Sequence, residues 1–309
     1  MITDLPTEED FIASSDQFFN LAWDRLSELS EYVRDTNLGD DDPLADEYWT
    51  AAQHKLSNAL ILLQQGAEFA LKGRICSVSP YLLIRSDSGD FPSKSQEVDL
   101  PFSEFKTIDA ASLIEVHDTF YKDRLPVSFR SHFSEVRKLR NSLMHTVDKR
   151  VVLVEKDVYR KLLESYALLH GEGRWISCRS EYIDNSEKAI TADGKLMRTD
   201  LFLEIRYVSE FLSDSEWKRY FGISKKARRY ICPSCESYTY ELIMDDHPNF
   251  AFLNPNTPDS TNLSCLLCDE QIDVIRSSCD QAGCPSNVLW AEDDTCLLCY
   301  GQGPKEDGS

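Results

Sequence analysis

The chain has 309 residues and a formal net charge of −20 at pH 7. Its hydrophobic content of 42% supports a sizeable core and excludes a disordered chain, while its acidic balance restricts nucleic-acid contact to local basic patches. The N-terminus lacks the basic and apolar blocks of a signal peptide, and the apolar run ALILL is too short to cross a bilayer. We therefore expect a cytoplasmic protein that does not contact a membrane.

Apolar residues recur at helical spacing over residues 15–35 and 48–75, which predicts two long helices separated by the acidic loop NLGDDDPLADEY. Three further helices are expected from about Asp109, from Pro126 to His145 or Thr146, and over residues 155–170. Because most of the connecting turns are short, these helices predict an antiparallel bundle over residues 1–173.

The helix that ends near His145 carries a charge inside its apolar stripe. On a helical wheel, Arg140 falls about 20° from Phe129, within the face that also holds Val136. An uncompensated guanidinium on a buried face costs several kcal/mol. Two interpretations stay open: the arginine binds a phosphate or lines a cleft between subunits, or it reaches solvent or pairs with a carboxylate.

The sequence RNSLMH, in which Asn141 follows Arg140 and His145 ends the segment, resembles the Arg-x(4–6)-His motif of HEPN domains (higher eukaryotes and prokaryotes nucleotide-binding). The segment LLQQGAEFALKGRI resembles the second bundle helix of that family, and the likeness covers roughly residues 10–172. The resemblance implies a HEPN-like bundle, a homodimer whose two motif helices meet, and a metal-independent endoribonuclease.

The resemblance also implies roles for these residues. His145 would act as general base or acid near the ribose 2′-OH, Arg140 would hold the scissile phosphate, and Asn141 would orient it, giving 2′,3′-cyclic phosphate ends. Residues 122–161 contain eleven Lys or Arg and five Asp or Glu, so 11 − 5 gives a local charge of +6. Arg137 and Lys138 are therefore candidate RNA contacts.

Three positions outside the motif carry further expectations. His117 and His132 are expected to be packed or surface histidines rather than catalytic ones. Val147 stands where one branch of the family has a tyrosine that is adenylylated, so that form of control is not expected. In bacteria such proteins act as toxins or phage-defence effectors, and an antitoxin or regulatory protein is a further candidate partner.

Residues 174–230 predict a helical connector with a short basic helix, DSEWKRYFGISKKARRY. Basic side chains alternate there with aromatic ones, a pattern that suits RNA phosphates and stacked bases. It equally suits an ordinary amphipathic helix. The candidate RNA contacts in this segment are Lys225, Lys226, Arg228 and Arg229.

Eight of the ten cysteines follow residue 230, which predicts a zinc-ribbon-like domain over residues 231–302 and a disordered tail over 303–309. The segments SYTYELIMDD and QIDVIRS are expected to be strands. Closed four-thiolate sites would make one or two zinc ions structural rather than catalytic. The first predicted set is Cys232, Cys235, Cys265 and Cys268, and the second is Cys279, Cys284, Cys296 and Cys299, although the sequence also allows interleaved pairing.

These expectations together predict a mainly α fold, in which an antiparallel bundle precedes a small zinc-stabilised β-rich domain. The alternative to a ribonuclease is a non-enzymatic scaffold. In that case the bundle dimerises, Arg140 is structural, and the ribbon binds nucleic acid or a protein partner.

Overall fold

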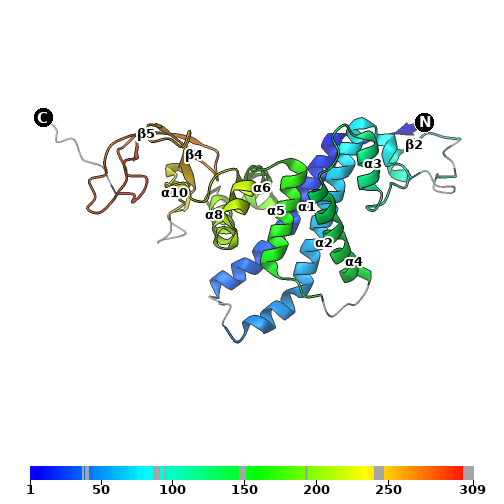
Figure 1. The fold of residues 1–309 in the computed structure, drawn as a ribbon, viewed down its shortest axis with the longest axis horizontal. Helices are drawn as coiled ribbons and strands as arrows, with labels where there is room; N and C mark the ends of the chain where they lie inside the picture. The colour runs from blue at the N-terminus through cyan, green and yellow to red at the C-terminus, as the bar shows by residue number, and fades with distance from the viewer. Residues whose placement is uncertain are drawn as a thin grey trace. The chain divides into compact units, whose positions relative to one another are not determined.

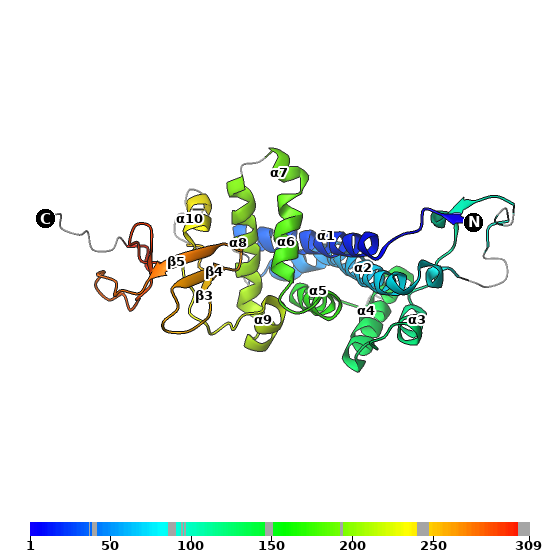
Figure 2. The same ribbon diagram turned by 90° about the horizontal axis from the view of Figure 1, so that it is seen from above.

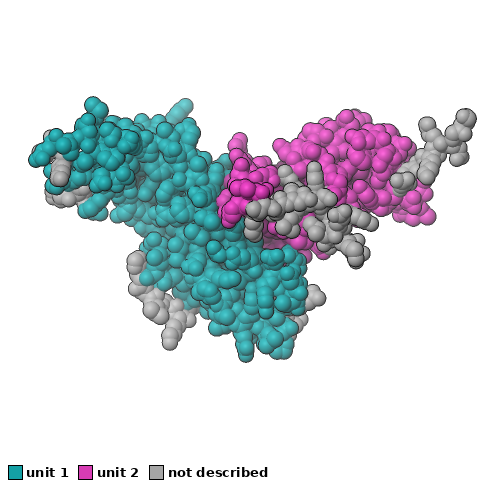
Figure 3. All heavy atoms as spheres, turned by 180° about the vertical axis from the view of Figure 1, so that it is seen from behind, with its two compact units in different colours: residues 1–172 teal, residues 173–309 magenta. Residues whose placement is uncertain are grey.

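The computed structural model describes residues 1–36, 38, 42–85, 91–93, 95, 97–145, 151–191, 194–239 and 247–301. The chain divides into two compact units, Met1–Glu172 and Gly173–Ser309 (Figure 3). The structure is mainly helical with a small antiparallel sheet and two cysteine clusters, so the predicted fold class is confirmed at this level. Within the described residues, no helix is both long and apolar enough to cross a membrane.

The first unit consists of long helices packed side by side (Figures 1 and 2). A long hairpin of two helices forms its centre, and the later helices pack against it. The helices are α1 (Glu8–Asp35), α2 (Ala45–Val78), α3 (Leu113–Phe120), α4 (Val127–His145) and α5 (Glu155–His170). The unit also contains two 3₁₀ turns, Pro80–Leu83 and Phe102–Glu104, and a short parallel pair, β1 (Ile2–Thr3) with β2 (Leu100–Pro101).

The α1–α2 hairpin is held together by a close apolar seam. Thr7 and Asp10 form a reciprocal capping box that starts α1. A Cβ atom added at Gly66 would lie 2.9 Å from the Phe19 ring, so only glycine allows the two helices to approach this closely. The buried Ser15 hydroxyl donates to the Gly66 carbonyl at 2.9 Å. Glycine and serine in the seam thus fix the register of the hairpin.

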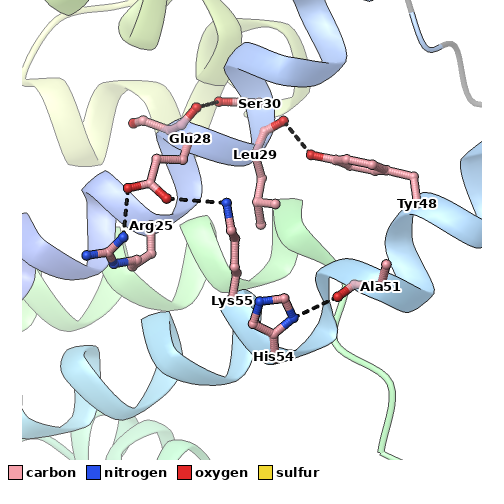
Figure 4. A network of polar contacts seen from close by, with 9 residues as sticks. Arg25, Glu28, Leu29, Ser30, Tyr48, Ala51, His54 and Lys55 are labelled. Atoms are coloured by element: carbon pink, nitrogen blue, oxygen red, sulfur yellow. Dashed lines mark hydrogen bonds and ion pairs between the residues drawn. The ribbon is translucent and has the colours of Figure 1, made fainter.

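A polar network lies at the edge of the same hairpin (Figure 4). Glu28 pairs with Arg25 at 2.7 Å and with Lys55 across the seam at 3.4 Å. The Tyr48 hydroxyl donates to the Leu29 carbonyl at 3.0 Å, and burial raises the pKa of Tyr48 to about 12. The exposed ion pairs of Glu28 add little stability one by one, but they agree with the register that the buried seam sets.

The second unit combines short helices with a four-stranded antiparallel sheet in the order β3-β4-β5-β6. Its helices are α6 (Trp175–Asp184), α7 (Glu187–Thr191), α8 (Gly194–Phe211), α9 (Asp214–Phe221) and α10 (Pro233–Thr239). Its strands are β3 (Ala251–Leu253), β4 (Asn262–Cys265), β5 (Gln271–Ile275) and β6 (Leu289–Trp290). Along the sheet, Ala251 pairs with Cys265, and Leu263 pairs with Ile272.

Aromatic side chains join the predicted connector to the cysteine-rich segment. Trp217 of α9 stacks on Phe250 with ring centroids 6.0 Å apart, and Phe202 of α8 contacts the same ring edge-on at 5.8 Å. Residues 174–230 therefore lie in the same compact unit as the cysteine-rich segment.

A pair of glycines brings the start of this unit against the end of α9. Gly222 ends α9 in a left-handed conformation, with φ of 78°. A Cβ atom added at Gly173 would lie 3.1 Å from the Gly222 Cα atom. The Gly173 N–H also donates to the Arg219 carbonyl at 3.1 Å. Side chains larger than hydrogen would separate these two backbones.

Two local predictions need correction. The segment SYTYELIMDD does not begin as a strand, because Ser237–Thr239 belongs to α10, and residues 240–246 lie outside the described part of the chain. Pro233, at the first position of α10, favours the helix over the β propensity of the tyrosine and threonine. The basic helix ends at Phe221, so its last basic residues follow it as irregular chain. The predicted strand QIDVIRS is confirmed over its first five residues, which form β5 (Gln271–Ile275).

Candidate functional site

The apolar stripe of α4 is buried along its first half only. Phe129, Phe133 and Val136 are almost fully buried against the bundle. After Val136 the burial decreases: Leu139 and Leu143 are half-buried, and Met144 is 49% exposed. In the described part of the chain, the C-terminal half of α4 therefore presents a partly exposed apolar surface.

Arg140 lies in this uncovered half and is itself half-buried. Its Nη1 donates to the Asn141 side-chain oxygen at 3.0 Å. Among the described residues no carboxylate forms an ion pair with Arg140, whereas Arg130 of the same helix pairs with Asp118 and Lys161 of α5 pairs with Glu135. A guanidinium has five N–H donors, so Arg140 can still bind an anion while Asn141 holds it in place.

His145 is the last residue of α4, and its side chain lies outside the described part of the structure. It lies five positions after Arg140, which is about 7.5 Å along the helix axis. Of the flanking candidates, Arg137 is half-buried and Lys138 is exposed. The structure therefore places Arg137, Lys138, Arg140 and Asn141 on the last turns of one helix, which ends at His145.

The two other bundle histidines occupy packed positions. His132 Nε2 lies 2.8 Å from the Ser165 hydroxyl, and burial lowers the pKa of His132. His117 is fully buried, hydrogen bonds to Asp118 at 3.0 Å through Nδ1, and has a pKa that burial lowers. Both rings are held by the protein's own groups, as expected for structural histidines.

The four candidate RNA contacts of the connector divide into two pairs. The Lys225 ammonium donates to the Leu212 carbonyl at 2.6 Å, and the Arg229 guanidinium lies 4.9 Å from the centre of the Phe250 ring. Burial lowers the pKa of Arg229. Lys226 is exposed and pairs with Asp214 at 3.0 Å, while Arg228 is exposed. Lys225 and Arg229 thus hold the unit together, and Lys226 and Arg228 face solvent.

The first cysteine cluster joins the start of α10 to the end of β4. Cys232 and Cys268 sulfurs lie 3.6 Å apart, and Cys235 and Cys265 sulfurs lie 3.7 Å apart. The Cys235 N–H points at the Cys232 sulfur at 3.5 Å, as in a tight thiolate-binding turn. Hydrogen bonding with the neighbouring cysteines, Cys232 first, raises the pKa of Cys235 and lowers the pKa of Cys268.

The second cluster follows β5 and ends after β6. Its closest sulfur pairs are Cys279 with Cys299, at 3.7 Å, and Cys284 with Cys296, at 3.8 Å. In each cluster all four sulfurs lie within 4.8 Å of one another. These separations exceed the S–S bond of about 2 Å, so all eight thiols are free, and the two predicted sets do not interleave. Each set has the arrangement of a metal site.

The cysteine-rich segment is strongly acidic. Residues 231–301 contain twelve Asp or Glu and a single basic residue, Arg276, so 1 − 12 gives −11. Every four-thiolate site that binds a divalent ion would add two more negative charges. The segment therefore repels phosphate groups. This charge follows from the amino-acid sequence alone.

The first unit also contains a groove of about 680 Å³ that the sequence did not predict. Trp49, Thr50 and Gln53 of α2 line one side, and the segment Val151–Lys156 lines the other. The Gln53 side-chain amide donates to the Leu153 carbonyl at 3.0 Å, and the Leu153 N–H donates back to the Gln53 oxygen at 2.8 Å. The sequence signal for this side of the groove is the β-branched run Val151–Val154, which favours an extended chain.

Comparison with known proteins finds no matching family model, no matching curated protein and no matching solved structure.

Proposed function

We propose that the helical bundle is an endoribonuclease that cleaves RNA without a metal ion in the reaction. The observation that carries the proposal is the position of Arg140: half-buried, held by Asn141, and without a described carboxylate to neutralise it. The local charge of +6 over residues 122–161 and the resemblance of RNSLMH to the HEPN motif support the same conclusion.

The chemistry follows from the residue types. A neutral His145 imidazole would take the proton of a ribose 2′-OH, whose oxygen then attacks the adjacent phosphorus. The bond to the 5′-oxygen breaks, and that oxygen leaves with a proton supplied by an imidazolium. The products are a 2′,3′-cyclic phosphate and a 5′-hydroxyl. Arg140 would stabilise the charge that gathers on the phosphate oxygens, and Asn141 would keep the guanidinium aligned.

RNA contact is assigned to the bundle rather than to the cysteine-rich segment. Arg137 and Lys138 lie on the same last turns of α4 as Arg140. The cysteine-rich segment, with twelve acidic residues and one basic residue, offers phosphates an unfavourable surface. Lys226 and Arg228, at the edge of that segment, are secondary candidates.

We propose in addition that each cysteine cluster binds one zinc ion in a structural role. Four sulfurs placed at about 2.3 Å around a tetrahedral ion lie about 3.8 Å apart. The shortest sulfur separations here are 3.6–3.8 Å. Four thiolates would fill each ion's coordination shell and leave no position for a substrate, so the ions would stabilise the second unit and take no part in cleavage.

The test is RNA cleavage by the purified full chain in buffer without added divalent cations. Wild type should cut a single-stranded RNA and leave 2′,3′-cyclic ends, and it should not cut the same sequence as DNA. Arg140→Ala and His145→Ala should each reduce the rate by about a hundredfold or more, the order expected for loss of a phosphate ligand or a general acid–base group. Arg25→Ala, which removes a helix arginine paired with Glu28, should leave the rate unchanged.

Full activity in Arg140→Ala would exclude this proposal and favour a non-enzymatic scaffold. In cells, a nuclease of this kind would act as a toxin or phage-defence effector, so expression of wild type should arrest growth and expression of His145→Ala should not. An arrest that persists in His145→Ala would point to a cause other than RNA cleavage.

A further inference from the structure

The two cysteine clusters differ in how far solvent reaches their sulfurs. In the first cluster every cysteine except the half-buried Cys268 is buried. In the second cluster only Cys296 is buried, and Cys299 is exposed. Oxidation of a thiolate depends on access of the oxidant to the sulfur, so a reagent in solution should reach the second cluster first.

The exposed Cys299 lies beside a second accessible thiol. Its sulfur is 3.7 Å from the sulfur of Cys279, which is half-buried. Residues 280–283, which follow Cys279, are all exposed, so packing does not hold this side of the cluster in place. The two sulfurs are therefore neighbours that can approach to the length of an S–S bond, which is about 2 Å.

The other side of the second cluster is fixed in the fold. Leu297, between the two cysteines of the last C-x2-C turn, is fully buried. Its carbonyl accepts from the Ile231 N–H at 2.7 Å, and its N–H donates to the Val288 carbonyl at 3.1 Å. Because these contacts do not involve a metal ion, they would keep the turn in place when the ion leaves.

The charge around the second cluster selects the kind of oxidant. Residues 277–301 contain four acidic residues and no basic one, and Asp280, Glu292 and Asp293 are exposed. Four thiolates around a divalent zinc ion would add two more negative charges. An anionic oxidant such as glutathione disulfide is repelled by this charge, whereas a small neutral peroxide is not.

We propose that Cys299 and Cys279 form a peroxide-reactive site, and that their oxidation to a disulfide releases the zinc ion of the second cluster while the first cluster keeps its own. The inference rests on the proposed zinc sites. It does not depend on the proposed nuclease.

The reaction is a two-electron oxidation by hydrogen peroxide. The Cys299 thiolate attacks one peroxide oxygen, the O–O bond breaks, and hydroxide leaves, which converts Cys299 to a sulfenic acid. The Cys279 thiolate then attacks the Cys299 sulfur, an S–S bond forms, and a second hydroxide leaves. The two sulfurs lose two electrons and the peroxide gains them, and two protons from solvent convert the hydroxides to water. The zinc ion retains only two of its four thiolate ligands and dissociates.

The test follows zinc release from the full chain, purified with both ions bound and free of reductant. Hydrogen peroxide is added, and a chromogenic zinc chelator reports the released metal. One ion per chain should leave at least about tenfold faster than the other, since exposure controls the oxidation of a thiolate. Alkylation at the end of the fast phase, followed by peptide mass spectrometry, should show a Cys279–Cys299 disulfide. The four cysteines of the first cluster should be alkylated, which marks them as reduced.

Two histidine substitutions make a matched pair, because histidine can replace one cysteine as a zinc ligand. Cys299→His should keep two ions before oxidation and slow the fast phase by about tenfold or more, since it removes the attacking thiolate. Cys268→His, which changes the most accessible ligand of the first cluster, should leave the fast phase as in the wild type. Native mass spectrometry gives the zinc content of each variant, and the disulfide map of the wild type tests the site without any variant.

Equal release rates for the two ions would overturn the inference. Oxidation of the first cluster before the second, or a fast phase in which Cys279 and Cys299 stay reduced, would also overturn it. In each of these cases two ions are present at the start, so the proposed zinc sites would stand. A wild-type chain that holds no zinc before oxidation would instead refute the zinc sites themselves.

Discussion

The side-chain amide of Gln53 and the backbone of Leu153 exchange two hydrogen bonds, of 3.0 and 2.8 Å, between α2 and the segment that precedes α5. A glutamine amide offers a donor and an acceptor in the same arrangement as a peptide group, so it can take the place of a neighbouring strand. One side chain therefore holds the chain that follows the candidate site in an extended form.

Loss of this contact should destabilise the first unit. Gln53→Ala removes both bonds and leaves the Leu153 groups without a partner, which costs about 1–3 kcal/mol. Urea unfolding followed by circular dichroism measures the change. Gln65→Ala, a matched substitution later on α2 where the glutamine is half-buried, should cost less than about 0.5 kcal/mol. Equal losses in the two variants would show that helix propensity, and not the Leu153 contact, determines the effect.

Gly66→Ala should lower the free energy of unfolding in spite of alanine's better helix propensity. The propensity gain is about 1 kcal/mol, whereas forcing a methyl group into a filled core costs about 1–3 kcal/mol. The new Cβ would lie 2.9 Å from the Phe19 ring, which is fully buried and packed edge-on against Tyr166. Phe19→Leu, combined with Gly66→Ala, should cost less than the sum of the two single changes. Strict additivity in this double-mutant cycle would contradict the steric explanation.

The metal content of the chain should follow the two cysteine clusters. Native mass spectrometry of the wild type should show two zinc ions per chain. Cys265→Ser and Cys284→Ser should each reduce the count to one, and each should lower the melting temperature of the second unit. Cys178→Ser, which changes a cysteine outside both clusters, should keep two ions. A wild-type chain with intact disulfides and no metal would refute the assignment.

Stability should decrease as the pH falls through the range in which histidine titrates. Burial lowers the pKa of His132 in the folded chain, so this histidine takes up a proton in the unfolded chain first as the pH falls. The stability that the neutral His132 contributes above about pH 6.5 is therefore lost below that pH. The charged groups near His132 are Glu164, Lys161 and Glu135. Between pH 7.5 and 5.5, His132→Gln should flatten the decline in the free energy of unfolding, measured with urea. A slope identical to that of the wild type would remove His132 from the explanation.

The predictions from sequence that the structure confirms concern elements for which several sequence patterns indicate the same structure. Residues 155–170 were predicted as a helix and form α5, because helical periodicity lies there between a β-branched run and Gly171. The two cysteine sets were also predicted correctly, because each C-x2-C turn places two sulfurs together whatever the rest of the fold does. In both cases a local pattern was sufficient for the prediction, although the closest sulfur pairs join residues as far apart as Cys232 and Cys268.

Other features of the fold could not be predicted from the sequence, mostly because they depend on contacts between residues far apart in the chain. The helical wheel places Arg140 in the apolar stripe, but periodicity cannot indicate that the core ends after Val136. The extended segment at Leu153 depends on a glutamine one hundred residues earlier. At α10, the β propensity of Tyr238 and Thr239 is overridden by the turn that starts at Cys232 and Pro233. Tertiary structure determines the first two features, which no short window of sequence contains, whereas the third depends on a local turn.

The contact between Gly173 and Gly222 has a practical consequence for dividing the protein. It places the first residue of the second unit against the end of α9, so a fragment that starts at Gly173 would retain the contact in full. A gene fragment encoding residues 173–301 would carry both glycines, every element from α6 to β6 and all eight clustered cysteines. Such a fragment, produced in zinc-supplemented medium, is the natural starting material for spectroscopy of the clusters in isolation.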